Sequence, residues 1–474
     1  MQRAEILEEI SGYCRIAGLA ESTFGRRAVN DGKLVSRIRD GGRITERTLG
    51  RIHAFIADNP PDAMAQTNFI VPHNGGGPRR VPDTLDLETQ TGLQPAKSKT
   101  GTGEENFRFF DNRQKYLLFV NTCSEKEVIA QRVTLELANI KPRPPAVRVF
   151  DAGMGDGSVL SRVMRSMHTR FRAMPFYIVA KEISLEDVRL SLDKMPDRFH
   201  EHPATVLVVT NLYYSESPWL TTNSSAAASS FVWKECALEG DTAHEFEEQI
   251  TELGPFLAEN WQARIGARGN PVYDRPVALV IYRRDHKFLL DQVIPKRGAT
   301  EANFDLIMAS QPYRARSPVE FKAQKVLAPL ARALGSGGRL IGIHSYGHDP
   351  GMEIIDKVWP GDDPFQTDRH AILKAVKKEL GGEARHLNFN AYADNRSIFR
   401  YDMHTLPNEV DSSIGTSTLF AAWNAAIYVA QVEEDRVEQA TLDGRYVEAT
   451  RAVLRERGGL WFHDESYVIS RRRD

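Results

Sequence analysis

The chain has few cysteines and no long apolar run, and both absences narrow what it can be. Its three cysteines, Cys14, Cys123 and Cys236, are far apart and have no paired spacing, which argues against a disulfide framework and a zinc site. The first ten residues carry three glutamates instead of the apolar core of a signal peptide. No apolar stretch approaches the roughly 20 residues that span a bilayer. We therefore expect a cytoplasmic protein without a membrane span.

A strong net charge is also missing. The formal charge is −2 over 474 residues, so no global field draws the protein to nucleic acid or membrane. A content of 41% hydrophobic and 26% charged residues is ordinary for a globular protein. The length exceeds one ordinary domain, and no internal repeat is visible. We therefore expect several domains, and any attraction to nucleic acid has to be local.

Residues 1–57 form the first expected domain, a small helical module. Ser22 and Thr23 are typical residues at the start of a helix, residues 30–32 read Asn-Asp-Gly and supply a turn, and residues 33–40 are predicted to form the next helix. Two helices around a tight glycine turn make a helix-turn-helix arrangement. The segment from Phe24 to Val35 resembles short helix-turn-helix segments of bacterial regulators.

The module also has a local excess of positive charge. Between Ser22 and His53 there are eight basic residues against three acids. We expect possible contact with DNA or RNA through one helix, by Lys33, Ser36, Arg37 and Arg39. The alternative is a helical hairpin used for packing, with a solvated basic face. Residues 58–103 then lose periodicity and are rich in glycine and proline, which predicts a flexible linker.

The most informative motif lies at residues 147–157. An apolar run reaches Asp151, glycines follow at 153, 155 and 157, and an apolar pattern at helical spacing comes next. Such a strand, loop and helix lets a cofactor lie against bare backbone, because glycine permits positive φ and close approach. A nicotinamide-binding loop would have a glycine where this chain has Ser158, and a phosphate-binding P-loop would have Gly-Lys-Ser/Thr, which is absent. Both departures argue against these two kinds of nucleotide site.

This motif resembles motif I of the class I S-adenosyl-L-methionine (SAM) dependent methyltransferases. The resemblance implies an α/β domain over residues 104–410, with a doubly wound, mostly parallel seven-stranded sheet. It implies that Asp151, Gly153, Gly155 and Gly157 bind SAM, and that Glu182, after the strand at 176–180, binds both ribose hydroxyls. Asn211, after a strand at 205–209, is expected to contact adenine. Such a reaction requires no metal.

A second motif resembles the family's motif IV, which lies beside the transferred methyl group. The strand at 304–309 is followed by Ser310, Gln311, Pro312 and Tyr313. Methyltransferases of amino groups have Asn, Asp or Ser there, then two prolines and an aromatic residue, so Gln311 replaces the first proline. The resemblance implies that these four residues orient the acceptor and that Tyr313 stacks on it. The alternative is an ordinary strand end, with Pro312 as a helix-start signal.

His344 is expected to be a hydrogen-bonded structural residue more than a general base.

The remaining segments extend this domain. Two helical patterns at 107–139 are expected either to cover the cofactor as a lid or simply to pack on the sheet. An insertion at about 215–300 is expected to border the substrate cleft. Strands near 386–392 and 397–403 are expected to close the sheet as an antiparallel pair, and residues 411–474 to form a helical C-terminal extension.

These patterns together predict a SAM-dependent methyltransferase that acts on a small-molecule, lipid or saccharide-type acceptor. One alternative is a methyltransferase of nucleic acid or protein amino groups that is guided by the helical module. The other is a DNA-binding regulator with a non-catalytic SAM-binding fold. We expect no metal, and the methyl acceptor itself is not identified by the sequence.

Overall fold

The computed structural model describes residues 3–16, 21–29, 31, 33–39, 44–58, 113–266, 271–298, 301–404 and 414–473. The chain divides into two compact units, Met1–Thr100 and Gly101–Asp474. The linker expected at 58–103 lies outside the described residues beyond Asp58. In the described part of the chain no helix is long and apolar enough to cross a membrane.

The described residues of the first unit form four helices, α1 (Arg3–Ile16), α2 (Glu21–Val29), α3 (Leu34–Arg39) and α4 (Glu46–Asp58). Buried apolar side chains from all four form its core, among them Ile6, Phe24 and Ile52. The turn between α2 and α3 is tight, because the Asp31 N–H donates to the Gly25 carbonyl oxygen at 3.0 Å. A Cβ on Gly25 would lie 2.3 Å from the Asp31 carbonyl oxygen, so this turn requires glycine.

The second unit is built on a ten-stranded sheet with the order β10-β12-β9-β8-β1-β2-β3-β7-β4, and β11 also pairs with β12. The strands are β1 (Val147–Asp151), β2 (Phe176–Lys181), β3 (Thr205–Thr210), β4 (Val232–Leu238), β7 (Val277–Arg283), β8 (Phe304–Ser310), β9 (Leu334–Ser345), β10 (Leu387–Asn390), β11 (Ile398–Asp402) and β12 (Trp461–Arg471). Strands β3, β2, β1, β8 and β9 are parallel, and β12 is antiparallel to β9. A separate hairpin pairs β5 (Ala263–Ile265) with β6 (Pro271–Tyr273).

This order and the antiparallel strand beside β9 confirm the class I methyltransferase-type sheet. The expected number of seven strands is too low. The insertion adds β7 and β4 beyond β3, and β7 is buried along its whole length, so it continues the sheet instead of covering it. At the other edge β10 and β11 pair with β12 and not with each other, which corrects the expected closing pair.

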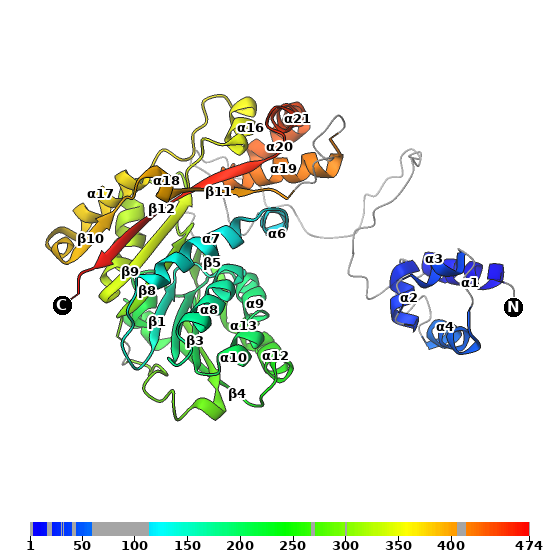
Figure 1. The fold of residues 1–474 in the computed structure, drawn as a ribbon, viewed down its shortest axis with the longest axis horizontal. Coiled ribbons are helices and arrows are strands. Elements are labelled where there is room, and N and C mark those ends of the chain that lie inside the picture. The colour runs from blue at the N-terminus through cyan, green and yellow to red at the C-terminus, as the bar shows by residue number, and fades with distance from the viewer. Residues whose placement is uncertain are drawn as a thin grey trace. The chain divides into compact units, whose positions relative to one another are not determined.

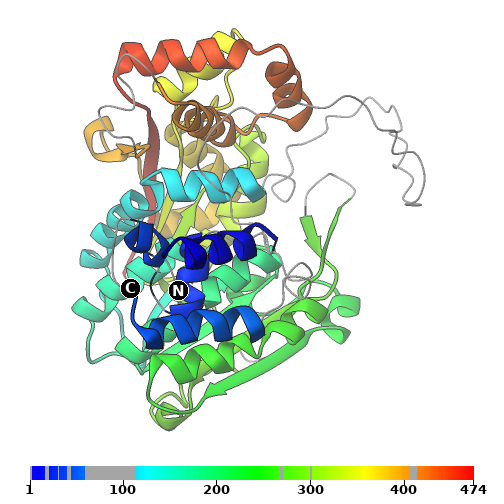
Figure 2. The same ribbon diagram turned by 90° about the vertical axis from the view of Figure 1, so that its right-hand side faces the viewer.

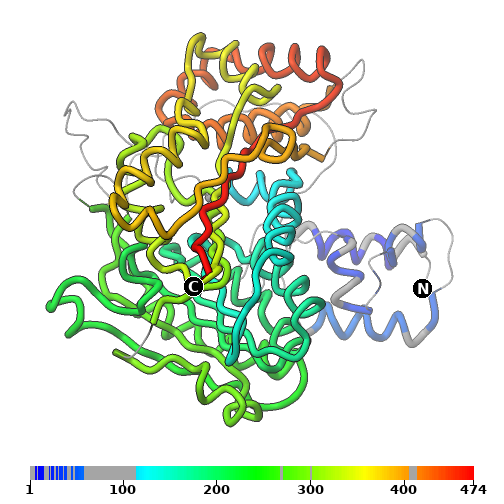
Figure 3. The backbone as a smooth tube through the Cα atoms, turned by 60° about the vertical axis from the view of Figure 1, so that its left-hand side comes forward, coloured from blue at the N-terminus to red at the C-terminus, as the bar shows by residue number. Residues whose placement is uncertain are grey.

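The C-terminal segment also differs from its expected place outside the domain. Its helices α19 (Thr416–Val429), α20 (Glu434–Leu442) and α21 (Arg445–Arg457) are present, and they gather at one end of the unit (Figure 2). The strand that follows them, β12, runs between β9 and β10 inside the sheet (Figure 3). Residues 462 and 464–470 of β12 are all buried, as a central strand requires. The three helices are therefore an insertion between β11 and β12.

Helices cover both faces of the sheet and one end of it. One face packs against α7 (Glu125–Thr134), α8 (Ser158–Arg170), α9 (Leu185–Leu192), α10 (Pro196–Glu201), α12 (Ala243–Thr251) and α13 (Gly254–Asn260). The other face packs against α15 (Ala328–Arg332), the π-helical turn Ala323–Leu327 after α14 (Val319–Lys322), and α17 (Arg369–Leu380). A third core joins α6 (Arg113–Thr122) and α16 (Pro350–Val358) to α19–α21. Short helices α11 (Ser225–Ser229) and α18 (Asp394–Ser397) complete the unit.

Candidate functional site

The candidate site lies at the carboxyl ends of the central parallel strands. Asp151 ends β1, Glu182 directly follows β2, Ser310 ends β8 and Ser345 ends β9. Parallel strands end at the same edge of a sheet, and open α/β sheets bind ligands at that edge. The structure therefore brings the residues expected to bind the cofactor together with those expected to contact the acceptor.

The three glycines of the loop after β1 have different roles. Gly155 and Gly157 have φ angles of +51° and +76°, which favour glycine. A Cβ on Gly157 would also lie 2.3 Å from Ser191 Oγ. At Gly153 a Cβ would meet only the Ser310 carbonyl oxygen, at 3.9 Å. Protein packing does not require a glycine there, so Gly153 leaves bare backbone open between the ends of β1 and β8.

Glu182 holds this loop through its carboxylate. Its Oε2 accepts the Gly155 N–H at 2.9 Å, and its Oε1 accepts the N–H groups of Ile183 at 2.7 Å and Ser184 at 3.0 Å. A carboxylate offers about four acceptor positions, so about one is left. The expected contact with two ribose hydroxyls would use that position and share or displace the Gly155 contact; it stays a prediction.

Asp151 is a buried carboxyl, only 4% exposed, at the open end of the loop. Its Oδ1 accepts a hydrogen bond from the Gly153 N–H at 3.3 Å. Burial raises the pKa of Asp151 to about 7 and the nearby Glu182 adds to the rise, whereas the Gly153 hydrogen bond and the Lys126 ammonium oppose it. A cation placed beside Asp151 would restore its ionisation.

Lys126 on α7 is the cation of this acidic region, and the sequence analysis did not single it out. Its Nζ lies 3.0 Å from Glu125 Oε2. Burial alone would lower the pKa of Lys126, but Glu125 and other neighbours outweigh it and the pKa is raised. Burial and Glu182 also raise the pKa of a second carboxyl near the loop, Asp187, to about 7. Two carboxyls with raised pKa values therefore lie near the Lys126 ammonium group, and a second ammonium group, that of Lys194, lies 3.4 Å from Asp156 Oδ2 in the loop.

The helices before β1 contact the cofactor loop directly. The Tyr116 hydroxyl on α6 donates to Asp156 Oδ1 at 3.2 Å and accepts the Asp156 N–H at 3.3 Å. A Cβ on Gly155 would lie 3.2 Å from the same hydroxyl. Of the two expected arrangements, cover over the loop is the one that the contacts of α6 support.

Asn211 is engaged away from this loop. Its Nδ2 donates to the Arg275 carbonyl oxygen at 2.8 Å, and its Oδ1 accepts the Val277 N–H at 2.8 Å. The amide therefore ties the end of β3 to the start of β7, a strand that the insertion supplies. The geometry gives its expected contact with adenine no support, and that contact stays a prediction.

The loop after β8 turns sharply at Gln311, a non-glycine residue with φ of +47°. The Gln311 N–H donates to the Ile343 carbonyl oxygen at 2.9 Å, and its Nε2 donates to Ser345 Oγ at 3.1 Å and Asp464 Oδ1 at 3.3 Å. The Pro312 carbonyl oxygen accepts the Tyr214 hydroxyl at 2.9 Å. No helix begins at Pro312 in this described segment, since α14 begins at Val319. A left-handed residue held by three contacts is typical of functional loops.

Tyr313 is buried in the core, which corrects the expectation that its ring stacks on a substrate. Only 8% of the residue is exposed. Its hydroxyl lies 2.9 Å from His344 Nδ1 and 3.0 Å from the Tyr467 hydroxyl. The turn at Gln311 sends the following residues inward, toward β9 and β12, instead of along the open edge. Tyr313 therefore anchors the loop.

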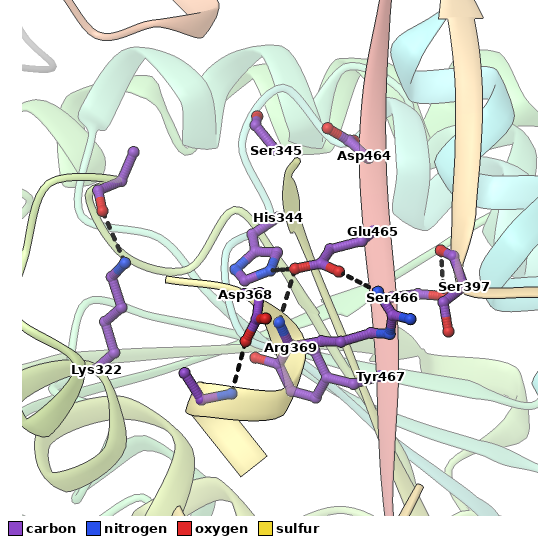
Figure 4. A network of polar contacts seen from close by, with 12 residues as sticks. Lys322, His344, Ser345, Asp368, Arg369, Ser397, Asp464, Glu465, Ser466 and Tyr467 are labelled. Atoms are coloured by element: carbon purple, nitrogen blue, oxygen red, sulfur yellow. Dashed lines mark hydrogen bonds and ion pairs between the residues drawn. The ribbon is translucent and has the colours of Figure 1, made fainter. Parts of the chain in front are cut away.

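The anchor continues through a buried polar network (Figure 4). His344 Nε2 lies 2.7 Å from Glu465 Oε1, which also accepts the Arg369 N–H at 2.7 Å, and Arg369 Nη1 donates to Glu465 Oε2 at 2.7 Å. Burial would raise the pKa of Glu465, but the hydrogen bonds from His344 and Arg369 outweigh it and lower the pKa. His344 is therefore a hydrogen-bonded residue held by an ionised carboxylate, as the sequence analysis expected.

Within the described residues, no group of three or more His, Cys, Asp or Glu side chains could hold a metal ion. The polar groups at the edge of the sheet are instead carboxyls, amides and hydroxyls around exposed backbone. This arrangement can bind a cation with hydroxyl groups and hold a second molecule near Ser310 and Gln311.

Comparison with known proteins finds only distant structural likenesses. No family model matches the chain, and no curated protein matches it. Among solved structures, the plantazolicin methyltransferase BpumL in complex with SAH is 9% identical over 77% of this chain and 92% of its own, with a TM-score of 0.29. Phosphoethanolamine N-methyltransferase 2 of Haemonchus contortus, in complex with SAM, is 11% identical over 78% of this chain and 60% of its own, with a TM-score of 0.26. The rRNA methyltransferase aviRa of Streptomyces viridochromogenes is 14% identical over 46% of this chain and 73% of its own, with a TM-score of 0.21. At these values the assignment of the fold depends on the strand order itself.

Proposed function

We propose that the protein is a SAM-dependent methyltransferase that acts on a small-molecule, lipid or saccharide-type acceptor. The observation that carries this proposal is the open backbone of Gly153, placed between the Asp151 carboxyl and Ser310 at the edge of a class I methyltransferase-type sheet. Among the described residues, none lies so close to Gly153 that a side chain there would clash with it. A ligand that lies against the loop explains it.

The charges around the loop fit SAM. SAM carries a sulfonium and an ammonium group, and the buried carboxyls Asp151 and Asp187 have pKa values raised to about 7 by burial, so a bound cation would favour their ionised forms. The methionine part also has a carboxylate, and Lys126 is an ammonium group close enough to Asp151 to lower its pKa. The remaining acceptor position of Glu182 suits a ribose hydroxyl.

The protein's part in the reaction is to bind, orient and exclude water. Bound SAM supplies an activated methyl group on its sulfonium. Asp151, Glu182 and the glycine loop would fix its position, and Gln311 would fix the backbone beside Ser310 where the acceptor enters. Tyr116, which holds α6 on the loop, would exclude water from the site.

A small acceptor suits the distribution of charge. The net charge of −2 and the carboxyls of the site oppose a polyanionic substrate such as nucleic acid at the catalytic edge. The insertion, the residue range 215–300 of the predicted domain, extends the sheet beyond β3 and would border the entrance as expected from the sequence. We place the protein in the cytoplasm, a prediction that its three free cysteines fit.

Two variants test this modular proposal. We expect Asp151→Ala to lose SAM binding in calorimetry, because it removes the buried carboxyl that faces the cation. We expect deletion of residues 1–57 to leave SAM binding unchanged, because the structure divides between Met1–Thr100 and Gly101–Asp474. Equal loss of binding in both proteins would contradict the modular account.

The second candidate function concerns the first unit and nucleic acid. Lys33, Arg37 and Arg39 are exposed at α3, as DNA or RNA contact requires, whereas the side chain of Ser36 lies outside the described part. Arg37 pairs with Asp31 at 2.9 Å and Arg39 with Glu21 at 3.0 Å, so binding would have to replace two surface ion pairs. Such pairs are worth about 0–1 kcal/mol each, which phosphate contacts can exceed.

This second candidate includes an amino-group methyltransferase guided by nucleic acid and a regulator with a non-catalytic SAM-binding fold. Fluorescence anisotropy with a labelled random DNA duplex and a matched RNA tests it. We expect binding that weakens steeply with salt and that is reduced in the variant Lys33→Ala. Affinity that does not change with salt would contradict electrostatic contact through α3.

A further inference from the structure

Two neighbouring carboxyls on β12 are buried on opposite faces of the sheet, and they differ in their hydrogen-bond partners. Glu465, which is 1% exposed, accepts hydrogen bonds from the Arg369 N–H and Nη1, and its Oε1 lies 2.7 Å from His344 Nε2. Asp464 is 0% exposed, its Oδ1 accepts the Gln311 side chain at 3.3 Å, and the Ser345 hydroxyl also hydrogen-bonds to its carboxyl group. In the described part of the chain, Asp464 Oδ2 has no hydrogen-bond partner. Figure 4 shows Asp464 turned away from the contacts of Glu465 and close to Ser345.

An unpartnered buried carboxyl oxygen is costly, by about 1–3 kcal/mol or more for a charged group, and native proteins keep few of them. A second buried oxygen at this place, the Tyr401 hydroxyl, also has no hydrogen-bond partner among the described residues. The buried Glu125 carboxylate beside it is paired with the Lys126 ammonium group, whose Nζ lies 3.0 Å from Glu125 Oε2. Burial raises the pKa values of both Asp464 and Tyr401, and the nearby Glu125 carboxylate raises them further. The three groups therefore lie close together.

The position of this cluster connects it with the candidate active site. Gln311, the strained residue after β8, donates through one nitrogen to both Asp464 and Ser345. Asp464 also pairs in register with Ser345, the last residue of β9. The unpartnered oxygens are therefore beside the loop that the proposed function assigns to the methyl acceptor, on the side where α7 begins.

We propose that this cluster, the Asp464 site, binds an amine of the methyl acceptor and that Asp464 is a catalytic residue that takes its proton. This inference rests on the proposed function. A carboxyl oxygen and a phenol that lack hydrogen-bond partners among the described residues, beside a second carboxyl group, suit a group with several N–H donors and positive charge. A hydroxyl acceptor has a single donor, and a carboxylate or phosphate would be repelled by Glu125 and Asp464.

The step balances in charge and electrons. Burial raises the pKa of Asp464 well above its usual value, so the free protein holds this carboxyl protonated, and its proton leaves to solvent as the ammonium group of the acceptor binds beside it. The ammonium group then passes one proton to Oδ2, which leaves a neutral amine and a neutral carboxyl. The nitrogen lone pair then forms a bond to the methyl carbon of SAM, and the electron pair of the broken carbon–sulfur bond goes to sulfur. The products are the methylated ammonium group and S-adenosylhomocysteine, and Asp464 keeps the proton until the next exchange with solvent.

The test begins with the identity of the product. The full-length protein is incubated with SAM labelled in its methyl group and with the small-molecule fraction of a cell extract, and labelled products are identified by mass spectrometry. We expect an N-methyl amine. A labelled ester, ether or thioether as the main product would overturn the proposal, and this result does not depend on the folding of any variant.

Matched variants then test Asp464 itself. We expect Asp464→Asn to reduce formation of the labelled amine at least about 100-fold, the size of effect of a general base, and to leave the Kd for S-adenosylhomocysteine within about twofold. The exposed acid Asp291 supplies the control Asp291→Asn, with unchanged activity. Tyr401→Phe removes an unpartnered hydroxyl at the same place, and we expect a raised KM for the labelled acceptor.

The outcomes separate this inference from the proposed function. If Asp464→Asn keeps more than a third of the activity, a buried water fills the Asp464 site and the inference is wrong, although the protein is still a methyltransferase. If the unaltered protein does not bind S-adenosylhomocysteine, the proposed function fails first and the inference fails with it.

Discussion

Asp151→Asn should make the free protein more stable and at the same time remove its affinity for the cofactor. The structural reason is that burial raises the pKa of Asp151 from 3.8 to about 7. The folded state therefore holds a proton that the unfolded chain releases above pH 3.8. As the pH rises from 3.8 to 7, the carboxyl increasingly destabilises the folded state. An asparagine of the same shape stays neutral at every pH and still accepts the Gly153 N–H.

The magnitude follows from the size of the shift. A shift of about 3 pKa units at about 1.36 kcal/mol per unit gives about 4 kcal/mol above pH 7. We expect Asp151→Asn to raise the free energy of unfolding by about this order at pH 8, and by nearly nothing at pH 4. Urea unfolding of both proteins at pH 4, 6 and 8 measures it. A variant less stable than the natural protein at pH 8 would refute the burial argument.

The same carboxyl predicts the pH dependence of SAM binding. Below its pKa of about 7, raised by burial, Asp151 is neutral and attracts the sulfonium poorly. We expect affinity for SAM to rise by up to about tenfold per pH unit between pH 5 and 7 and to level off above, and Asp151→Asn to abolish this rise. Asp187, whose pKa is also raised to about 7, supplies the control. If Asp187→Asn alone removes the pH dependence, Asp151 is not the group that binds the cation.

Three further predictions concern stability. Gly157→Ala should destabilise the second unit by about 2–5 kcal/mol in urea unfolding, because a left-handed residue would carry a Cβ 2.3 Å from Ser191 Oγ; an unchanged midpoint would contradict this. Glu465→Gln should lower Tm by several degrees, since it breaks a buried network of charged hydrogen bonds, whereas Asp464→Asn should not; equal effects would contradict the contrast between the two carboxyls. Burial lowers the pKa of His202 below its unfolded value of 6.5, so the stability that neutral His202 contributes is present above pH 6.5 and is lost as the pH falls below that value. We expect His202→Gln to flatten the pH dependence of Tm below pH 6.5.

The central parallel strands could be predicted because local patterns in the chain mark each of them, and the resemblance of the loop after Asp151 implied the type of sheet. The run that ends at Asp151 and the glycines after it fix β1 and its loop, and alternation of strands and helices then predicts a parallel sheet. The last strand was placed outside the domain because three helices separate it from β11. The pairing between β9 and β12 joins segments that are far apart in the sequence, so no local pattern predicts it.

The site could be predicted in part for the same reason. Asp151, Glu182 and Ser310 end strands that the sequence shows, and the structure brings them to one edge. Tyr313 was misplaced because a positive φ at Gln311 cannot be read from a glutamine, and this turn decides which way the ring points. Asp464 and Lys126 were missed because burial without a partner is a property of the folded packing, not of residue type.

The central claim is that the glycine loop binds SAM. Calorimetric titration of the unaltered full-length protein with SAM and with S-adenosylhomocysteine at pH 8 tests it most directly, with Asp151→Ala as the matched variant. We predict that one molecule of either ligand binds per chain and that binding is lost in the variant. No heat and no thermal shift with millimolar concentrations of either ligand would contradict the account.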